Sequence, residues 1–259
     1  MNYHFRTNYY SVFLPKRGIS SIKPVEKGIH GIFFPSCNFR CIYCNNENHP
    51  KCNYSITSIE QFRKTIQHAI LTGKFFKFTG GEPLTNPDLQ RDIKIVKDLG
   101  GDILIDTNGS RPKIVDNILS NFIIDTIGIS LKGLTKKQSM QISRINNPVL
   151  CWDNVFNTLS CCASHPKTRV IVTMVFHDNM GYKEIVEFAR LMEPYPRVCL
   201  KFNNLLLNQQ GLSDFRPLST GKLQSLLEEF INKNPQWDGR CFIVDEIEAV
   251  RDSNRIITL

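Results

Sequence analysis

Short apolar runs alternate along the chain with segments in which apolar residues recur every three to four positions, and this alternation predicts strands and helices in turn. Runs that predict buried strands lie at 29–34, 75–78, 103–105, 123–131, 170–176 and 198–207. Segments with helical spacing lie at 58–72, 87–99, 111–121, 152–164, 181–193 and 220–233, and a further helical region is interrupted by Asn146-Asn147-Pro148. Six strands alternating with helices predict an α/β fold of parallel β/α units with right-handed crossovers.

The two ends of the chain are expected to lie outside this repeating unit. Residues 1–27 have weak periodicity, so we expect an irregular N-terminal lead-in with a short strand near 9–14. Residues 28–207 are expected to form the main domain. Residues 208–259 are expected to form a C-terminal extension, a helix and a tail packed on that domain, with 241–244 and 256–259 as candidates for a further strand. No linker rich in Gly, Ser or Pro divides the chain.

Composition is that of an ordinary globular protein, with 41% hydrophobic and 22% charged residues among 259. We find no signal peptide and no apolar run that approaches the roughly 18 residues of a membrane span, so a cytoplasmic protein without a membrane partner is expected. The formal net charge is +8, with basic side chains concentrated in the first thirty residues and at 131–150. We interpret this charge as a solubility feature and expect no nucleic-acid partner, since no RNA-binding motif accompanies it.

Three of the nine cysteines, Cys37, Cys41 and Cys44, fall within eight positions after the first strand. Their loop, 35–56, is long, and compact domains seldom tolerate such a loop unless it has a function. Three thiolates on one tight loop can ligate three corners of a cubane iron–sulfur cluster, which leaves one iron open for a small molecule. The alternative is a structural zinc site, for which Cys52 or His49 could supply the fourth ligand.

A second motif, Gly80-Gly81-Glu82-Pro83, comes directly after the second predicted strand. Glycines at such a turn let a ligand approach the backbone, and a carboxylate such as that of Glu82 can receive an ammonium group. A plain strand-to-helix turn is the simpler interpretation of this motif taken alone. Its position one β/α unit after the cysteines favours the iron–sulfur interpretation.

Together these motifs resemble the radical S-adenosylmethionine (radical SAM) superfamily, and Tyr43, the aromatic residue before the last cysteine, also fits. The resemblance implies a partial (β/α)6 TIM-like barrel and two cofactors, a [4Fe–4S] cluster on the three cysteines and S-adenosyl-L-methionine on the fourth iron. It further implies that Gly80 to Pro83 contact the methionine amino group of that cofactor. Reductive cleavage would then give methionine and a 5′-deoxyadenosyl radical, which removes a hydrogen atom from the substrate.

A closer resemblance, from about residue 28 to residue 204, is to the glycyl-radical-enzyme activating enzymes, such as pyruvate formate-lyase activating enzyme. It is carried by Asp106-Thr107-Asn108-Gly109 after the third strand and by Ser130-Leu131-Lys132 after the fourth. The resemblance implies that Asn108 and Lys132 lie near the cofactor's carboxylate or ribose, and Arg144 loosely matches a later basic residue of that pattern. Ser130 departs from it, since the activating enzymes have an Asp there that helps to organise a cation beside the cofactor.

Three further features of the sequence have competing interpretations. Asp106 either holds the loop around Asn108 or is a plain turn residue. His177 follows the fifth strand and could contact cofactor or substrate, although a lone His is more often a surface or hydrogen-bonded residue. Cys161-Cys162 falls in a predicted helix and is interpreted as core or surface thiols.

Three functions remain open from the sequence. The first is a radical enzyme that abstracts hydrogen from a protein or peptide, such as a glycyl-radical enzyme, with electrons from a low-potential donor such as flavodoxin or ferredoxin. The second is a radical enzyme of the same superfamily that acts on a small molecule or nucleoside. The third is a zinc-stabilised binding module without catalysis, against which the turn at Gly80 to Pro83 argues.

Overall fold

The computed structural model describes residues 3–6, 14–15, 22–23, 29–44, 54–56, 58–205 and 215–244. Within these ranges a nine-stranded sheet runs in the order β11-β10-β9-β8-β7-β6-β4-β1-β5, and each neighbouring pair from β11 to β4 is parallel. The parallel strands are β4 (Ile29–Phe34), β6 (Phe75–Gly80), β7 (Asp102–Thr107), β8 (Thr126–Ser130), β9 (Arg169–Phe176), β10 (Val198–Asn204) and β11 (Cys241–Val244).

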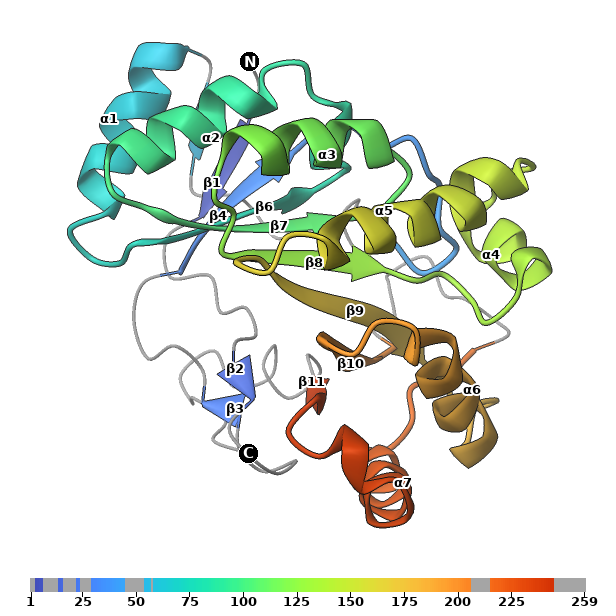
Figure 1. Cartoon of the computed structure of the whole chain (residues 1–259). Helices are drawn as coiled ribbons and strands as arrows, with labels where there is room; N and C mark the ends of the chain where they lie inside the picture. The colour runs from blue at the N-terminus through green and yellow to red at the C-terminus, as the bar shows by residue number, and fades with distance from the viewer. Residues whose placement is uncertain are drawn as a thin grey trace.

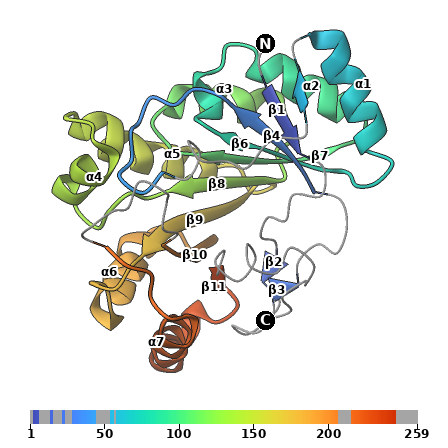
Figure 2. The same ribbon diagram turned by 180° about the vertical axis from the view of Figure 1, so that it is seen from behind.

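Helices connect the parallel strands and cover the outer face of the curved sheet (Figures 1 and 2). They are α1 (Ile59–Ala69), α2 (Leu89–Asp98), α3 (Pro112–Asn121), α4 (Lys136–Ser143), α5 (Asn154–Ala163), α6 (Tyr182–Met192) and α7 (Thr220–Lys233). Shorter turns are the 3-10 helices η2 (Pro83–Thr85) and η4 (Pro235–Trp237) and the π-helical turn η3 (Val149–Asp153), which runs directly into α5. This open arc of β/α units confirms the predicted α/β fold, a partial TIM-like barrel.

Side chains alternate along each parallel strand between the helix-covered face and the inner face. On β6, Phe76 and Phe78 belong to the main hydrophobic core, and the buried Lys77 lies between them on the opposite side. On β10, the buried Lys201 likewise lies between two core residues. The outer face of the sheet is therefore apolar and packed against helices, while the inner face also carries polar groups.

Side-chain hydrogen bonds account for where α1 and β8 begin. Ser58 Oγ accepts the backbone N–H of Gln61 at 3.1 Å and caps α1. The fourth parallel strand begins at Thr126, three residues later than predicted. The reason is Asp125, whose carboxylate accepts the backbone N–H of Ile103 at 2.7 Å and the ammonium of Lys97 at 2.6 Å, so side-chain contacts hold the segment before the strand.

The N-terminal lead-in differs from the prediction. Strand β1 (Tyr3–Arg6) pairs antiparallel with β4, and β5 (Tyr54–Ile56), which falls inside the predicted loop 35–56, pairs antiparallel with β1. A small separate pair joins β2 (Leu14–Pro15) to β3 (Ile22–Lys23). Residues 9–13 and 256–259 lie outside the described ranges, whereas the candidate strand at 241–244 is confirmed as β11. Strands this short carry no periodicity of their own, so only their pairing partners define them.

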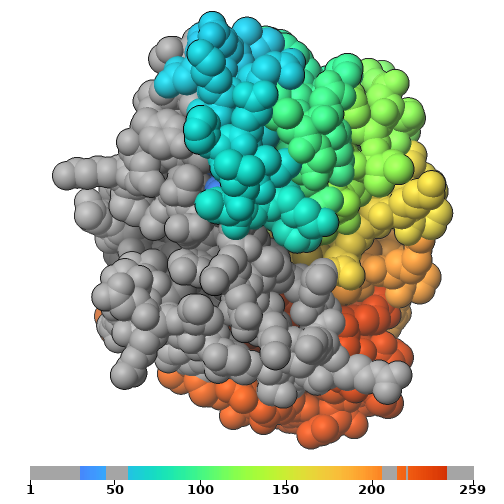
Figure 3. Space-filling view, turned by 90° about the vertical axis from the view of Figure 1, so that its left-hand side faces the viewer, coloured from blue at the N-terminus to red at the C-terminus, as the bar shows by residue number. Residues whose placement is uncertain are grey.

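The two ends of the sheet lie at opposite ends of the molecule. In Figure 3, α1 and α2 (cyan to blue-green) lie at one end and the C-terminal segments (orange to red) at the other. None of the helices described is long and apolar enough to cross a membrane. Barrel enzymes have their active sites at the carboxyl ends of the parallel strands, so we expect a site at this edge of the sheet.

Candidate active site

The cysteine loop follows β4 and is docked onto the C-terminal end of α4. The backbone N–H groups of Arg40 and Ile42 donate to the carbonyls of Ser143 and Ile142 at 3.0 and 2.9 Å. The last carbonyls of a helix have no partner within the helix, so these bonds satisfy two of them. Because α4 belongs to the fourth β/α unit, the contact ties the loop to a segment about a hundred residues away, and the sequence contains no signal for it.

The Gly80-Gly81 turn at the exit of β6 packs against the start of the cysteine loop. Gly81 N–H donates to the carbonyl of Phe34 at 2.7 Å, and Glu82 N–H donates to that of Ser36, also at 2.7 Å. Gly80 has a φ of +97°, and a Cβ added at Gly81 would lie 1.9 Å from the carbonyl oxygen of Ser36. The close approach of the two strand exits therefore requires glycine at both positions, with or without a bound ligand.

Glu82 is fully buried, and its carboxylate joins the exits of β6 and β7. Oε1 accepts the hydroxyl of Thr107 at 2.6 Å and the N–H of Leu84 at 3.1 Å, and Oε2 accepts the N–H of Asn108 at 2.6 Å. Burial raises the pKa of Glu82 to about 7, although these hydrogen bonds and the charge of Lys132 act in the opposite direction. A ligand ammonium at this carboxylate would have to share oxygens that the protein already uses.

Asn108 connects the exit of β7 to the cysteine loop. Its side-chain Nδ2 donates to Asn38 Oδ1 at 2.8 Å and lies 3.9 Å from Cys37 Sγ, while its Oδ1 accepts the N–H of Ser110 at 3.0 Å. Asn38 in turn donates from Nδ2 to Ser110 Oγ at 2.9 Å. The structure thus brings Cys37, Glu82 and Asn108 into one hydrogen-bonded network, and Asn38, which the sequence did not single out, is part of it.

Asp106 lies on the inner face of the sheet. One of its oxygens is 2.5 Å from the ammonium of Lys77 on the neighbouring strand β6. The other occupies the space above Gly128, where an added Cβ would lie 2.3 Å from Asp106 Oδ1. This ion pair, with Lys77 buried and Asp106 partly exposed, was not anticipated by either sequence interpretation of Asp106.

The charge of Lys132 acts on the thiols of the cysteine loop. Cys37 is exposed, Cys41 and Cys44 are partly exposed, and the Lys132 ammonium lies 6.0 Å from the ring centroid of the buried Tyr43. Burial raises the pKa of Cys37 to about 11 and raises that of Cys41, while the charge of Lys132 lowers both. Metal binding requires thiolates and displaces their protons, and a nearby cation favours that step.

The remaining predicted residues occupy separate positions. Ser130 ends β8 and pairs in register with Thr173 of β9. Arg144 is exposed and takes a left-handed conformation, with a φ of 54°, directly after α4. His177 follows β9, where its ring lies 4.3 Å from that of Phe215 and its Nδ1 is 3.4 Å from the N–H of Asn179. Burial lowers the pKa of His177, so the neutral form is favoured at pH 7.

The donor set suits an iron–sulfur cluster. Three thiols on one short loop can each ligate one iron of a cubane cluster and leave the fourth iron open for a small molecule. Among the residues that the structure describes, no group of three His, Cys, Asp or Glu side chains is placed to hold a single metal ion. His49 and Cys52, the candidate fourth ligands of a zinc site, lie outside the described residues.

Comparison with known proteins agrees with this geometry. The family model described as "Radical SAM superfamily" matches residues 32–192, which is more than half of the chain. The chain belongs to the radical SAM superfamily. It is therefore an enzyme whose cofactors are a [4Fe–4S] cluster and S-adenosylmethionine, and similar solved structures contain the latter.

The names of individual relatives refer to different activities. A GTP 3′,8-cyclase of Pelotomaculum thermopropionicum is 27% identical over 60% of this chain and 48% of its own length. A putative glycyl-radical enzyme activating enzyme of Methanocaldococcus jannaschii is 29% identical over 44% of this chain and 47% of its own. This radical SAM chain thus spans about half the length of these curated relatives.

Among solved structures, the fold is similar to that of Streptococcus suis SuiB bound to precursor peptide SuiA. The TM-score is 0.66 at 16% sequence identity, over 87% of this chain and 52% of that one. At this identity the likeness concerns the fold alone.

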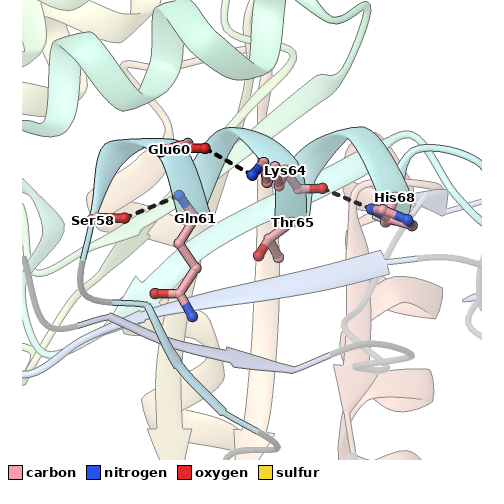
Figure 4. A pocket seen from close by; sticks show the side chains of 6 residues that line it. All are labelled: Ser58, Glu60, Gln61, Lys64, Thr65 and His68. Carbon is pink, nitrogen blue, oxygen red and sulfur yellow. Dashed lines mark hydrogen bonds and ion pairs between the residues drawn. The ribbon is translucent and has the colours of Figure 1, made fainter.

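A separate polar pocket lies along α1, and Figure 4 shows the side chains that line it: Ser58, Glu60, Gln61, Lys64, Thr65 and His68. Its groups bond one another, with Glu60 Oε1 2.7 Å from Lys64 Nζ and His68 Nδ1 3.1 Å from the carbonyl oxygen of Lys64. Helices α1 and α4 lie on opposite sides of the molecule (Figures 1 and 2). This pocket is therefore not part of the cysteine site.

Proposed function

We propose that this radical SAM enzyme abstracts a hydrogen atom from a protein or peptide substrate. The observation that carries the radical chemistry is the cysteine loop, held by backbone hydrogen bonds at the exit of β6 and the end of α4 and by side chains at the exit of β7. When bound, the cluster and S-adenosylmethionine supply a 5′-deoxyadenosyl radical by reductive cleavage. The electron would come from a low-potential donor such as flavodoxin or ferredoxin.

The chain's own residues would hold and orient these groups. Cys37, Cys41 and Cys44 would ligate three irons, and the N–H groups of Gly81 and Glu82 would hold the start of their loop in place. Near these thiols, Lys132 presents a cation on the β8 side that could attract a carboxylate. The substrate would bind at the carboxyl ends of the parallel strands, where barrel enzymes have their active sites.

Two lines of support favour a protein or peptide substrate. One curated relative is named as a glycyl-radical enzyme activating enzyme, and SuiB, of similar fold, is seen with its precursor peptide. A glycyl-radical enzyme or a short precursor peptide encoded beside this gene would be the first substrate to test.

A second candidate is a nucleotide or other small molecule, because a relative of comparable identity is named GTP 3′,8-cyclase. The two candidates separate in one assay, in which the enzyme is incubated with S-adenosylmethionine and a reductant. Deuterium moves from a labelled substrate into 5′-deoxyadenosine only when that substrate is the hydrogen donor. Transfer from labelled GTP, with none from a labelled precursor peptide or glycyl-radical enzyme, would replace the first candidate with the second.

The radical chemistry itself is tested by anaerobic reconstitution. We expect a brown protein that binds iron and sulfide and forms 5′-deoxyadenosine with dithionite, and Cys41→Ala should lose both properties. Cys161→Ala is the matched control, since Cys161 lies on α5 beside Asp116 and should leave both properties unchanged. A colourless protein with stoichiometric zinc, or retained cleavage in Cys41→Ala, would overturn the proposal.

A further inference from the structure

The side-chain amides of Asn38 and Asn108 have defined orientations. The backbone N–H of Ser110 fixes the amide of Asn108, and Asn108 then fixes that of Asn38. Ser110 N–H is a donor, so the Asn108 atom that faces it at 3.0 Å must be the carbonyl oxygen Oδ1. Asn108 Nδ2 therefore points the other way, to Asn38 and Cys37. Asn38 must then present Oδ1 to this donor, which leaves its Nδ2 to donate to Ser110 Oγ at 2.9 Å.

The network is held rigidly on the Asn108 side. Asn108 N–H donates to the buried Glu82 carboxylate at 2.6 Å, and the Ser110 carbonyl accepts Asn154 Nδ2 from α5 at 2.9 Å. Asn108 and Ser110 are both buried. Asn38, by contrast, lies next to Cys37 on the cysteine loop, so its two hydrogen bonds fasten that loop to a fixed frame.

Cys37 Sγ is approached by two N–H donors. The backbone N–H of Phe39 lies 3.4 Å from it, and Asn108 Nδ2 lies at 3.9 Å, the long end of the range for a hydrogen bond to sulfur. The donor from Asn108 reaches the sulfur because its other proton is taken by Asn38. An amide N–H near a cluster-ligating sulfur favours the reduced cluster, since reduction adds negative charge that the donor stabilises.

We propose that Asn38 is a positioning residue that holds the Asn108 amide N–H against Cys37 Sγ and thereby raises the reduction potential of the cluster. The proposal rests on the proposed function, because it requires Cys37 to ligate the cluster. In this proposal Asn38 acts on the cluster through Asn108.

The experiment compares Asn38→Ala, Ser110→Ala and the double variant with the parent enzyme after anaerobic reconstitution. The readout is the midpoint potential of the cluster, followed by its electron paramagnetic resonance signal. We expect unchanged iron content and, in Asn38→Ala, a shift to more negative potential. The expected size is about a fivefold fall in the ratio of reduced to oxidised cluster at a fixed potential, the equivalent of roughly one net hydrogen bond.

Ser110→Ala removes only the outer bond of Asn38 and should shift the potential less, in the same direction. The double variant should shift it no further than Asn38→Ala alone, because Ser110 acts through Asn38. Asn121→Ala is the control and should leave the potential unchanged, because the exposed Asn121 amide donates to Asn117 of the same helix, α3.

An unchanged potential in Asn38→Ala with full iron content overturns the proposal, as do additive shifts in the double variant. If Asn38→Ala loses iron, Ser110→Ala decides, and an unchanged potential there assigns Asn38 a purely structural role. A parent protein without a cluster would instead refute the proposed function, so the two failures are distinguishable.

Discussion

The close approach of the β6 exit to the cysteine loop predicts a large effect for Gly81→Ala. The new Cβ would lie 1.9 Å from the carbonyl oxygen of Ser36, 2.4 Å from its carbonyl carbon and 3.0 Å from the carbonyl oxygen of Phe34. Non-bonded atoms do not approach so closely, so the backbone at 34–36 or at 80–82 must move by about 1 Å. Each of these atoms belongs to backbone, which cannot rotate away as a side chain can.

The magnitude follows from what that movement breaks. Overpacking of this kind costs about 1–3 kcal/mol. The bonds from Gly81 N–H to Phe34 and from Glu82 N–H to Ser36, both 2.7 Å, would lengthen, at about 0.5–1.5 kcal/mol each. Since the terms overlap, we expect the free energy of unfolding of the apoprotein to fall by about 2–5 kcal/mol. Iron incorporation should also fall, because Ser36 immediately precedes Cys37.

The assay is urea unfolding of the apoprotein, together with iron content after anaerobic reconstitution. The control is Gly221→Ala in α7, where an added Cβ meets nothing within 4 Å. Ala in an open helical position should be neutral or stabilising by up to about 1 kcal/mol. If Gly81→Ala stays within about 0.5 kcal/mol of the parent and binds full iron, the argument from close backbone contact is refuted.

Three further predictions concern the surroundings of this turn. Burial raises the pKa of Glu82 from 4.5 to about 7, so its contribution to stability falls by about 3 kcal/mol as pH rises through that range. Glu82→Gln has no ionisable group at this position and lacks this dependence. The difference in unfolding free energy between the parent and Glu82→Gln, measured by urea unfolding, should therefore shrink between about pH 5 and pH 8. A difference that grows with pH would contradict the raised pKa of Glu82. Lys77→Met leaves the Asp106 carboxylate without this partner and should cost about 1–3 kcal/mol in thermal unfolding, and Lys77→Met/Asp106→Leu should cost less than the sum of the two single variants; a double loss equal to that sum would show that the pair is not coupled. Thr158→Val removes the hydroxyl bond to the carbonyl of Gly109 at 2.8 Å and should cost about 1 kcal/mol by the same measurement, whereas no loss would mean that the bond contributes nothing.

The fold could be predicted from the sequence where local pattern and tertiary position agree. Parallel strands buried by helices read as apolar runs, so β4, β6, β7, β9 and β10 were placed within a few residues. β1 and β5 were missed because a strand of three or four residues is defined by its partner and not by its own composition. The start of β8 was misplaced because Asp125 bonds laterally to β7 and α2, which no local pattern encodes.

In the candidate site, short-range motifs could be predicted from the sequence and long-range contacts could not. The cysteines and the Gly80–Pro83 turn were found as motifs, because their spacing is contained in a short stretch of chain. The clamp from Arg40 and Ile42 to α4 was not found, since it uses backbone groups that every residue possesses. The role of Asn38 is not visible in the sequence for a related reason. Its side chain gains a role only from Asn108 and Ser110, which lie about seventy residues later.

The turn after β6 also changes how its motif should be interpreted. Gly80 and Gly81 allow two backbones to meet, Glu82 joins two strand exits, and Pro83 begins the 3-10 turn η2 that Glu82 caps. Each of the four residues therefore has a structural reason that does not require a ligand. The motif therefore does not by itself identify a ligand. The stronger indication of one is Lys132, because its charge acts on Cys37, Cys41 and Glu82 together and would attract an anionic group to the cysteines.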